Sequence, residues 1–161
     1  MRRGRTLHTT RRSAVVTLPP EETWAVVASG ETGSQWYVDA LPLRVRRAID
    51  RVALGPALRR PPPGRPLLRS GDLVGFWQVT EADRATHRLE LVAQLRSPGR
   101  VTMRAHVEPH PDGSRLHLAV TLDPRGLVGR VYELIDLPAR ETVMELLMLH
   151  LLTVLRRAGG R

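Results

Sequence analysis

Apolar and polar residues alternate along three stretches in the middle of the chain, His87–Leu95, Val101–Glu108 and Arg115–Leu122. Such alternation is typical of antiparallel strands with one buried face and one solvated face. The apolar face would carry Leu89, Leu91, Ala93, Leu95, Val101, Met103, Ala105, Val107, Leu116, Leu118, Val120 and Leu122. The polar face would carry Arg88, Glu90, Gln94, Arg100, Thr102, Arg104, His106, Glu108, Arg115 and His117. Further strands are predicted at Ser13–Leu18, Leu67–Arg69 and Leu73–Thr80.

The longest helical pattern runs from Gly126 to Ala158 and is interrupted once, at Pro138. Two short helices are predicted after the first strand, at Pro20–Ser29 and about Leu41–Leu54. The segment Gly55–Pro66 holds five prolines and is predicted to be a loop near the mouth of a pocket. A long apolar helix after an antiparallel meander predicts an α+β fold in which a curved sheet wraps around the helix. A cavity for a small molecule would lie between them.

The chain is long enough for one domain with its own core. It has no cysteine, which excludes disulfides and thiolate chemistry. All 25 basic residues are arginine, and five of them lie in the first twelve residues. Residues 1–12 are therefore predicted to be a disordered basic tail, and residues 13–158 a single ligand-binding domain. The arginines of Arg44–Arg69 form either a patch for an anionic partner or a solvated surface.

Several short motifs, in a fixed order, resemble one family. They are Trp36-Tyr37, Arg46–Arg51, Gly71-Asp72, Phe76-Trp77-x-Val79, Ser97–Arg100, Gly113–Leu116 and Asp123–Tyr132. The chain resembles a bacterial family of proteins of unknown function in the START-like superfamily, also called SRPBCC, helix-grip or polyketide cyclase/dehydrase-like. The resemblance implies a helix-grip fold with a hydrophobic cavity. Superfamily members include lipid and hormone carriers, aromatic polyketide cyclases and alkaloid-forming enzymes, so the fold alone does not define the function.

Two positions depart from the pattern of that family. Gly75 stands where the family usually has an acid, and Leu118 stands where a polar residue is common. The pocket should therefore be more apolar than in other members. Related domains follow NAD(P)-binding domains, but this chain has no GxGxxG motif, so no cofactor is expected.

The candidate ligand-binding residues are Trp36, Tyr37, Trp77, Met103, Leu118 and Arg130. Trp36 and Tyr37 would line an entrance, where an indole or phenol offers stacking surface and one hydrogen bond. Trp77 is either a pocket wall beside the space left by Gly75 or an ordinary core residue.

The candidate catalytic residues lie in the first half of the long helix. Glu133 or Asp136 would act as a buried acid or base, and Tyr132 would donate a hydrogen bond to the same substrate. The alternative is a plain ion pair between Arg130 and Glu133, which are neighbours on a helix surface. The six histidines form no metal-binding pattern, although His106 and His117 would pair across adjacent strands.

Three functions are compatible with the sequence. The first is a binding protein for a small hydrophobic or aromatic metabolite, and the second is a cyclase, dehydratase or isomerase that uses the same cavity. The third, a nucleic-acid or anionic-surface binder, would need arginines gathered on one face. The chain shows neither a signal peptide nor a membrane span, so a cytoplasmic location is expected. The apolar surface around Leu149 would suit a homodimer contact.

Overall fold

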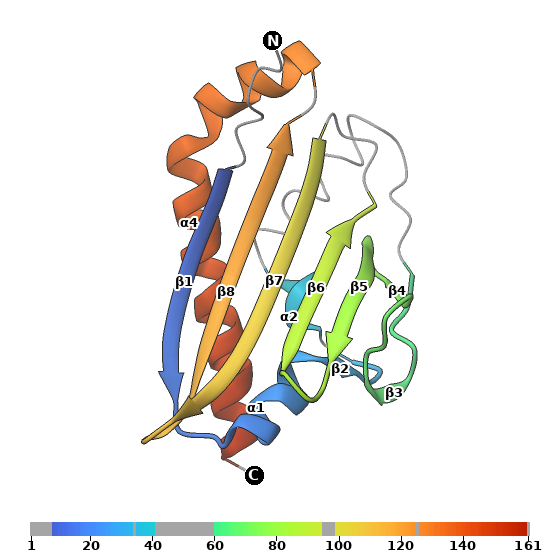
Figure 1. Cartoon of the computed structure of the whole chain (residues 1–161), viewed down its shortest axis with the longest axis vertical. Helices are drawn as coiled ribbons and strands as arrows, with labels where there is room; N and C mark the ends of the chain where they lie inside the picture. The colour runs from blue at the N-terminus through green and yellow to red at the C-terminus, as the bar shows by residue number, and fades with distance from the viewer. Residues whose placement is uncertain (1–7, 34, 41–59, 95–98, 125, 161) are drawn as a thin grey trace.

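The computed structural model describes residues 8–33, 35–40, 60–94, 99–124 and 126–160, with only the backbone for 8, 99, 124 and 126–140. The elements in chain order are β1 (His8–Val16), α1 (Pro20–Val27), β2 (Ser29–Gly30), α2 (Trp36–Asp39), β3 (Arg65–Leu67), β4 (Leu73–Val74), β5 (Trp77–Asp83), β6 (Arg88–Ala93), β7 (Gly99–His110), β8 (Gly113–Pro124) and α4 (Gly126–Gly159). Six strands form one antiparallel sheet in the order β1-β8-β7-β6-β5-β4, while β2 pairs with β3. The long helix runs along this sheet (Figure 1), which confirms the predicted α+β fold.

The alternation predicted for the middle strands is confirmed by burial. Leu89, Leu91, Met103, Leu116 and Leu118 are each no more than 2% exposed. They lie on the face of the sheet that turns toward the helices, which we call the inner face. Their neighbours in sequence point to the outer face, where the side chains are exposed or half-buried except for Val92, which is 6% exposed. Because the side-chain period of a strand is two residues, a single pattern defines both faces.

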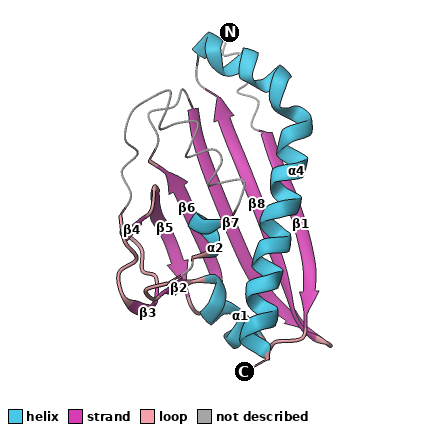
Figure 2. Cartoon of the chain, turned by 180° about the vertical axis from the view of Figure 1, so that it is seen from behind, coloured by secondary structure: helices cyan, strands magenta, loops and turns pink. Residues whose placement is uncertain are grey.

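The second half of α4 packs on the inner face with an apolar stripe. Met144, Leu147, Met148, Leu151 and Leu155 are at most 5% exposed and belong to the same core cluster as the sheet residues. Their spacing of three and four residues places them on one side of the helix. Figure 2 shows α4 crossing one face of the sheet, with α1 near its C-terminal end.

The interruption predicted at Pro138 does not end the helix, because α4 is continuous from Gly126 to Gly159. Figure 1 shows that the first turns of α4 are bent relative to the rest. A proline inside a helix removes one backbone hydrogen bond and can kink a helix without ending it.

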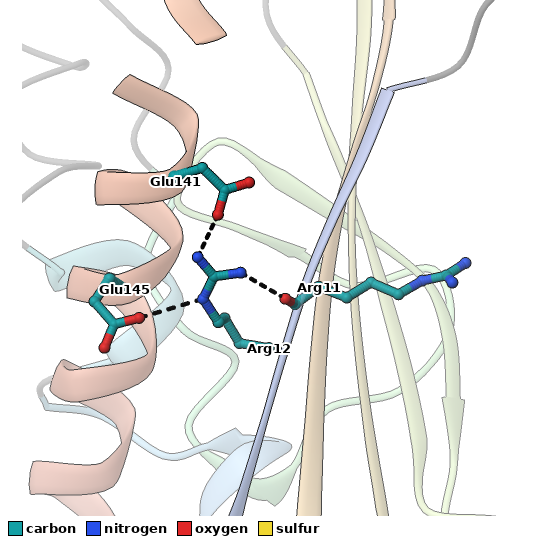
Figure 3. A network of polar contacts seen from close by, with 4 residues as sticks. All are labelled: Arg11, Arg12, Glu141 and Glu145. Carbon is teal, nitrogen blue, oxygen red and sulfur yellow. Dashed lines mark hydrogen bonds and ion pairs between the residues drawn. The ribbon is translucent and has the colours of Figure 1, made fainter. Parts of the chain in front are cut away.

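The predicted disordered tail is wrong for its last five residues. β1 begins at His8 and pairs in register with β8, from His8 opposite Leu122 to Val16 opposite Ser114. Arg12 points from β1 toward α4, where its Nη2 pairs with Glu141 and its Nε donates to Glu145 at 3.2 Å (Figure 3). The two glutamates are four residues apart and therefore neighbours on the helix. Arginine in this segment thus joins the edge strand to the helix.

The single strand predicted at Leu73–Thr80 is also wrong, because it is a tight hairpin. Val74 pairs with Trp77, so only Gly75 and Phe76 connect β4 to β5. Gly75 has φ +57°, which suits the first central position of a type II′ turn. An alternating pattern does not reveal a reversal of direction when the turn residues are themselves apolar.

The region before the sheet agrees in part with the prediction. α1 begins at Pro20 as expected and ends at Val27. The helix predicted at Leu41–Leu54 lies outside the described residues, and the short helix α2 precedes it. The buried Thr23 of α1 shares a 2.8 Å hydrogen bond with Ser114 of β8, which ties this region to the sheet.

Candidate functional site

Three of the predicted ligand-binding aromatics form a hydrogen-bonded scaffold beside the sheet. The indole of Trp36 donates to the carbonyl of Val27 at 2.9 Å, and that of Trp77 donates to the carbonyl of Tyr37 at 2.7 Å. The Tyr37 hydroxyl donates to the carbonyl of Ser29 at 2.7 Å. All three side chains are at most 2% exposed. Their polar atoms therefore hold α2 in place between α1 and the β4–β5 hairpin.

This scaffold predicts a dependence of stability on alkaline pH. Burial raises the pKa of the Tyr37 phenol, with the charges of Asp39 and Asp72 adding to the effect. Above about pH 10 the unfolded chain loses this proton while the folded protein keeps it, so unfolding becomes more favourable. We expect the free energy of unfolding to fall by up to about 1.4 kcal/mol per pH unit above pH 10. Urea denaturation between pH 8 and 11.5 measures the slope.

The matched variant is Tyr37→Phe, which lacks the titrating group. Its free energy of unfolding should be lower than that of the wild type at neutral pH, because the Ser29 carbonyl loses a donor. Above pH 10 its slope should be flatter. An unchanged slope in this variant would show that another group is responsible.

Of the two interpretations of Trp77, its burial favours the ordinary core residue, since the side chain is 2% exposed. A Cβ built on Gly75 would lie only 2.8 Å from Cγ2 of Val38. Val38 is 5% exposed and occupies the volume that a larger residue at position 75 would need. Glycine at this position therefore allows α2 to approach the hairpin closely.

The inner face of the sheet is less covered toward the end where α4 begins. Residues that pair across neighbouring strands form rows on this face. The two rows nearest α1 are buried, with exposed fractions of at most 3% for Leu116, Val107, Leu118 and Ala105. In the row at the other end Leu122, Val101 and Ala93 are all partly exposed, as is Val120 in the row before it. Leu122 pairs with Val101, so these side chains are adjacent on one face. This apolar surface lies at the end of the sheet from which α4 starts, since β8 ends at Pro124 and α4 begins at Gly126.

A hollow lies between α2 and the β4–β5 hairpin. It has a volume of about 250 Å³ and is bordered by Gln35, Asp39, Arg60 and the two prolines Pro61 and Pro62. Arg60 pairs with Gly75 through hydrogen bonds of 3.1 and 2.7 Å between their backbones. The described part of the proline-rich segment therefore borders a depression next to Trp36 and Tyr37.

The predicted catalytic residues fall where only the backbone is described. Tyr132, Glu133 and Asp136, together with the predicted ligand contact Arg130, all belong to the first half of α4. Their side chains lie outside the described residues, so their roles stay predictions. The other two predicted contacts, Met103 and Leu118, lie on the inner face and are 1% exposed.

Among the described residues, no group of three or more histidine, aspartate or glutamate side chains is placed to hold a metal ion. None of the described helices is long and apolar enough to cross a membrane.

Comparison with known proteins identifies the family. The model of the family described as "Protein of unknown function (DUF2867)" matches residues 3–146. No curated protein matches the chain. Among solved structures, the Zhui aromatase/cyclase from Streptomyces sp. R1128 has 14% identity and a TM-score of 0.53, with 97% of this chain and 96% of that chain covered.

Two other solved structures are less similar in shape. A protein from Rhodobacter sphaeroides has 20% identity and a TM-score of 0.49 over 92% of this chain and 90% of that one. Ara h 8.0201 has 13% identity and a TM-score of 0.45 over 92% of this chain and 99% of that one. The fold is a helix-grip fold. The chain belongs to the family of proteins of unknown function DUF2867.

Proposed function

We propose that this protein binds a small hydrophobic or aromatic metabolite between the inner face of the sheet and the first half of α4. Proteins with the helix-grip fold typically have a hydrophobic ligand-binding cavity in this place. The observation that carries the proposal is the loss of cover along the inner face, from buried Leu118 to partly exposed Val101 and Leu122. Apolar side chains that stay accessible inside a fold are the usual walls of such pockets.

The walls of the proposed cavity come from the four strands β5, β6, β7 and β8. Ala93, Val101 and Leu122 form its floor, and Met103 and Trp77 close it on the side of the packed core. Arg130 would contribute from the helix. Trp36 and Tyr37 act by holding α2 and the hairpin in place, and the hollow beside Gln35 and Arg60 would be the entrance. This protein would work in the cytoplasm, and the exposed apolar residues Val143, Leu146 and Leu149 of α4 would suit a homodimer.

A pair of neighbouring substitutions tests the cavity. Val101 faces the inner side of β7 and Thr102 the outer side, so Val101→Trp should fill the cavity while Thr102→Trp should not. The probe is 1-anilinonaphthalene-8-sulfonate, whose fluorescence rises in apolar pockets. We expect saturable binding to the wild type and to Thr102→Trp, and at least tenfold weaker binding to Val101→Trp.

Two further measurements make the result decisive. Circular dichroism should show the same melting behaviour for both variants, so that weaker binding is not caused by unfolding. Native mass spectrometry of the purified wild-type protein should show a bound metabolite that Val101→Trp lacks. Equal probe binding by both variants would place the apolar site elsewhere and contradict the proposal.

An enzyme that uses the same cavity is the second candidate. The solved structure with the highest TM-score among those compared above is an aromatase/cyclase, which is an enzyme with this fold. In this chain Tyr132 and Asp136 are one helical turn apart, and Glu133 and Asp136 are three residues apart, so the helix would present them close together. We would then expect Glu133→Gln or Asp136→Asn to abolish turnover of the bound metabolite while leaving its binding intact.

A further inference from the structure

A second, polar hollow lies on the outer face of the sheet, across β1, β8 and β7. Its volume is about 360 Å³, and its lining includes Arg11, Ser13, Arg104, His106, His117 and Ala119. It is separated from the proposed inner cavity by the thickness of the sheet. Arginine and histidine side chains thus meet in one depression.

The strand register explains why a depression forms there. Ala119 of β8 pairs with Arg11 of β1 and with Arg104 of β7, so two arginines flank one methyl group. In the next row His117 pairs with both Ser13 and His106. Side chains opposite one another in a sheet have Cβ atoms about 5 Å apart. The small Ala119 and Ser13 therefore form the floor, and the long arginines form the walls.

The described residues leave the Arg11 side chain available to a ligand. Its side chain extends to the side of β1 opposite Arg12 and α4 (Figure 3). Within the described residues no carboxylate lies at ion-pair distance from its guanidinium. Arg104 uses Nε in a 2.5 Å contact with Glu90, and none of the described residues bonds to its two terminal nitrogens. Both arginines can therefore present paired N–H groups to an oxyanion.

The two histidines stand next to these arginines. Their rings are stacked, with centroids 5.9 Å apart and an interplanar angle of 22°. His117 Nε2 contacts Glu108 at 2.9 Å, which leaves its Nδ1 available. Burial, followed by the charges of Arg88 and His117, lowers the pKa of His106. A bound anion would oppose this effect and favour the protonated imidazole.

The charged groups around the hollow leave it positive. Arg88 of β6 is opposite His106, and Arg115 of β8 is opposite Glu108. Together with Arg11 and Arg104 they make four arginines, against the two carboxylates Glu90 and Glu108. A depression of one sign of charge attracts a ligand of the opposite sign.

We propose that this outer hollow binds the phosphate group of a small, soluble phosphomonoester. Such a group carries a charge of about −1.5 to −2 at neutral pH and three acceptor oxygens. Arg11 and Arg104 hold it from opposite sides, Ser13 donates its hydroxyl, and the histidines donate from the adjoining row. The volume holds a phosphate with a small organic group attached. A polymer or a membrane would need a wider surface of the same charge.

The probe for this site is phenyl phosphate, followed by the imidazole Cε1–H resonances of the full-length protein. We expect saturable shifts of the His106 and His117 signals and a rise in the pKa of His106 at saturation. Arg11→Gln and Arg104→Gln should each weaken binding by about tenfold or more, because each removes a charge-assisted contact.

The matched control is Arg100→Gln, which removes an arginine from the outer face of β7 outside the hollow. Its affinity should stay within about twofold of the wild type, and 1-anilinonaphthalene-8-sulfonate binding should be the same in all three variants. Equal weakening by Arg100→Gln would mean general attraction by positive charge and would overturn the site. Tighter binding to a DNA duplex or to phosphatidylglycerol vesicles than to phenyl phosphate would overturn the assignment of a small ligand.

Discussion

Replacing Trp77 by alanine should lower the free energy of unfolding by about 3–5 kcal/mol, as expected for a large aromatic side chain removed from a core. Trp77 is 2% exposed and packs against Phe76, with ring centroids 4.8 Å apart. Its indole also donates to the Tyr37 carbonyl at 2.7 Å, so the substitution leaves a buried acceptor without its donor. Urea denaturation followed by circular dichroism measures the loss.

Two matched variants separate the parts of this effect. Trp77→Phe keeps most of the apolar volume and loses the hydrogen bond, so it should cost about 1–3 kcal/mol. Leu73→Ala removes an apolar side chain in the same hairpin that is 39% exposed, and should cost less than about 1 kcal/mol. A wild-type stability in Trp77→Ala would contradict this expectation and would mean that Trp77 contributes little to the core.

The faces of the sheet were predictable from the sequence because burial repeats every second residue in a strand. Leu91 and Met103 were placed on one face, and their register as neighbours confirms it. The stacking of His106 on His117 followed from the same alternation. A local pattern was sufficient for these residues because each strand obeys it independently of what packs on the sheet.

Features that depend on distant partners were not predictable in this way. Arg12 looked like part of a basic tail, since nothing near it in sequence reveals that Glu141 and Glu145 lie opposite. In the same way, nothing near Gly75 in sequence reveals that Val38 approaches it from a separate helix. Both features depend on long-range contacts, which a pattern of neighbouring residues does not encode.

The candidate sites also combine features that a local pattern predicts with features that depend on distant partners. The inner apolar rows could be predicted, including Met103, because they follow the strand period. The outer hollow was missed because Arg11 was counted as part of the tail. Arg104, His106 and His117 had been placed on the outer face. Only the pairing of β1 with β8 brings Arg11 opposite Ala119. That site depends on the order of the strands in the sheet. The alternation of apolar and polar residues does not determine this order.

Replacing Gly113 by alanine should lower the free energy of unfolding about as much as the loss of a core aromatic side chain. The cause is a clash of the added Cβ with the backbone of β1 and of the residue that follows it. Gly113 has φ +136°, a conformation that strains any residue with a Cβ. The added Cβ would lie 2.3 Å from the Val16 carbonyl oxygen and 2.7 Å from the Thr17 carbonyl carbon. Backbone strain costs about 1–3 kcal/mol. Displacing the end of β1 from β8 adds about 1–3 kcal/mol more.

The chain contains a control for this substitution with almost the same backbone angle. Gly33 has φ +133°, and nothing lies within 4 Å of a Cβ built on it. Gly33→Ala should therefore report the strain alone, and the difference in free energy of unfolding between the two variants should report the contact with β1. Hydrogen exchange of the β1 amides should increase in Gly113→Ala and stay unchanged in Gly33→Ala, since only the first pushes on Val16 and Thr17. Equal costs for the two substitutions would mean that β1 moves aside freely, in which case the pairing that brings Arg11 to the outer hollow would be weak as well.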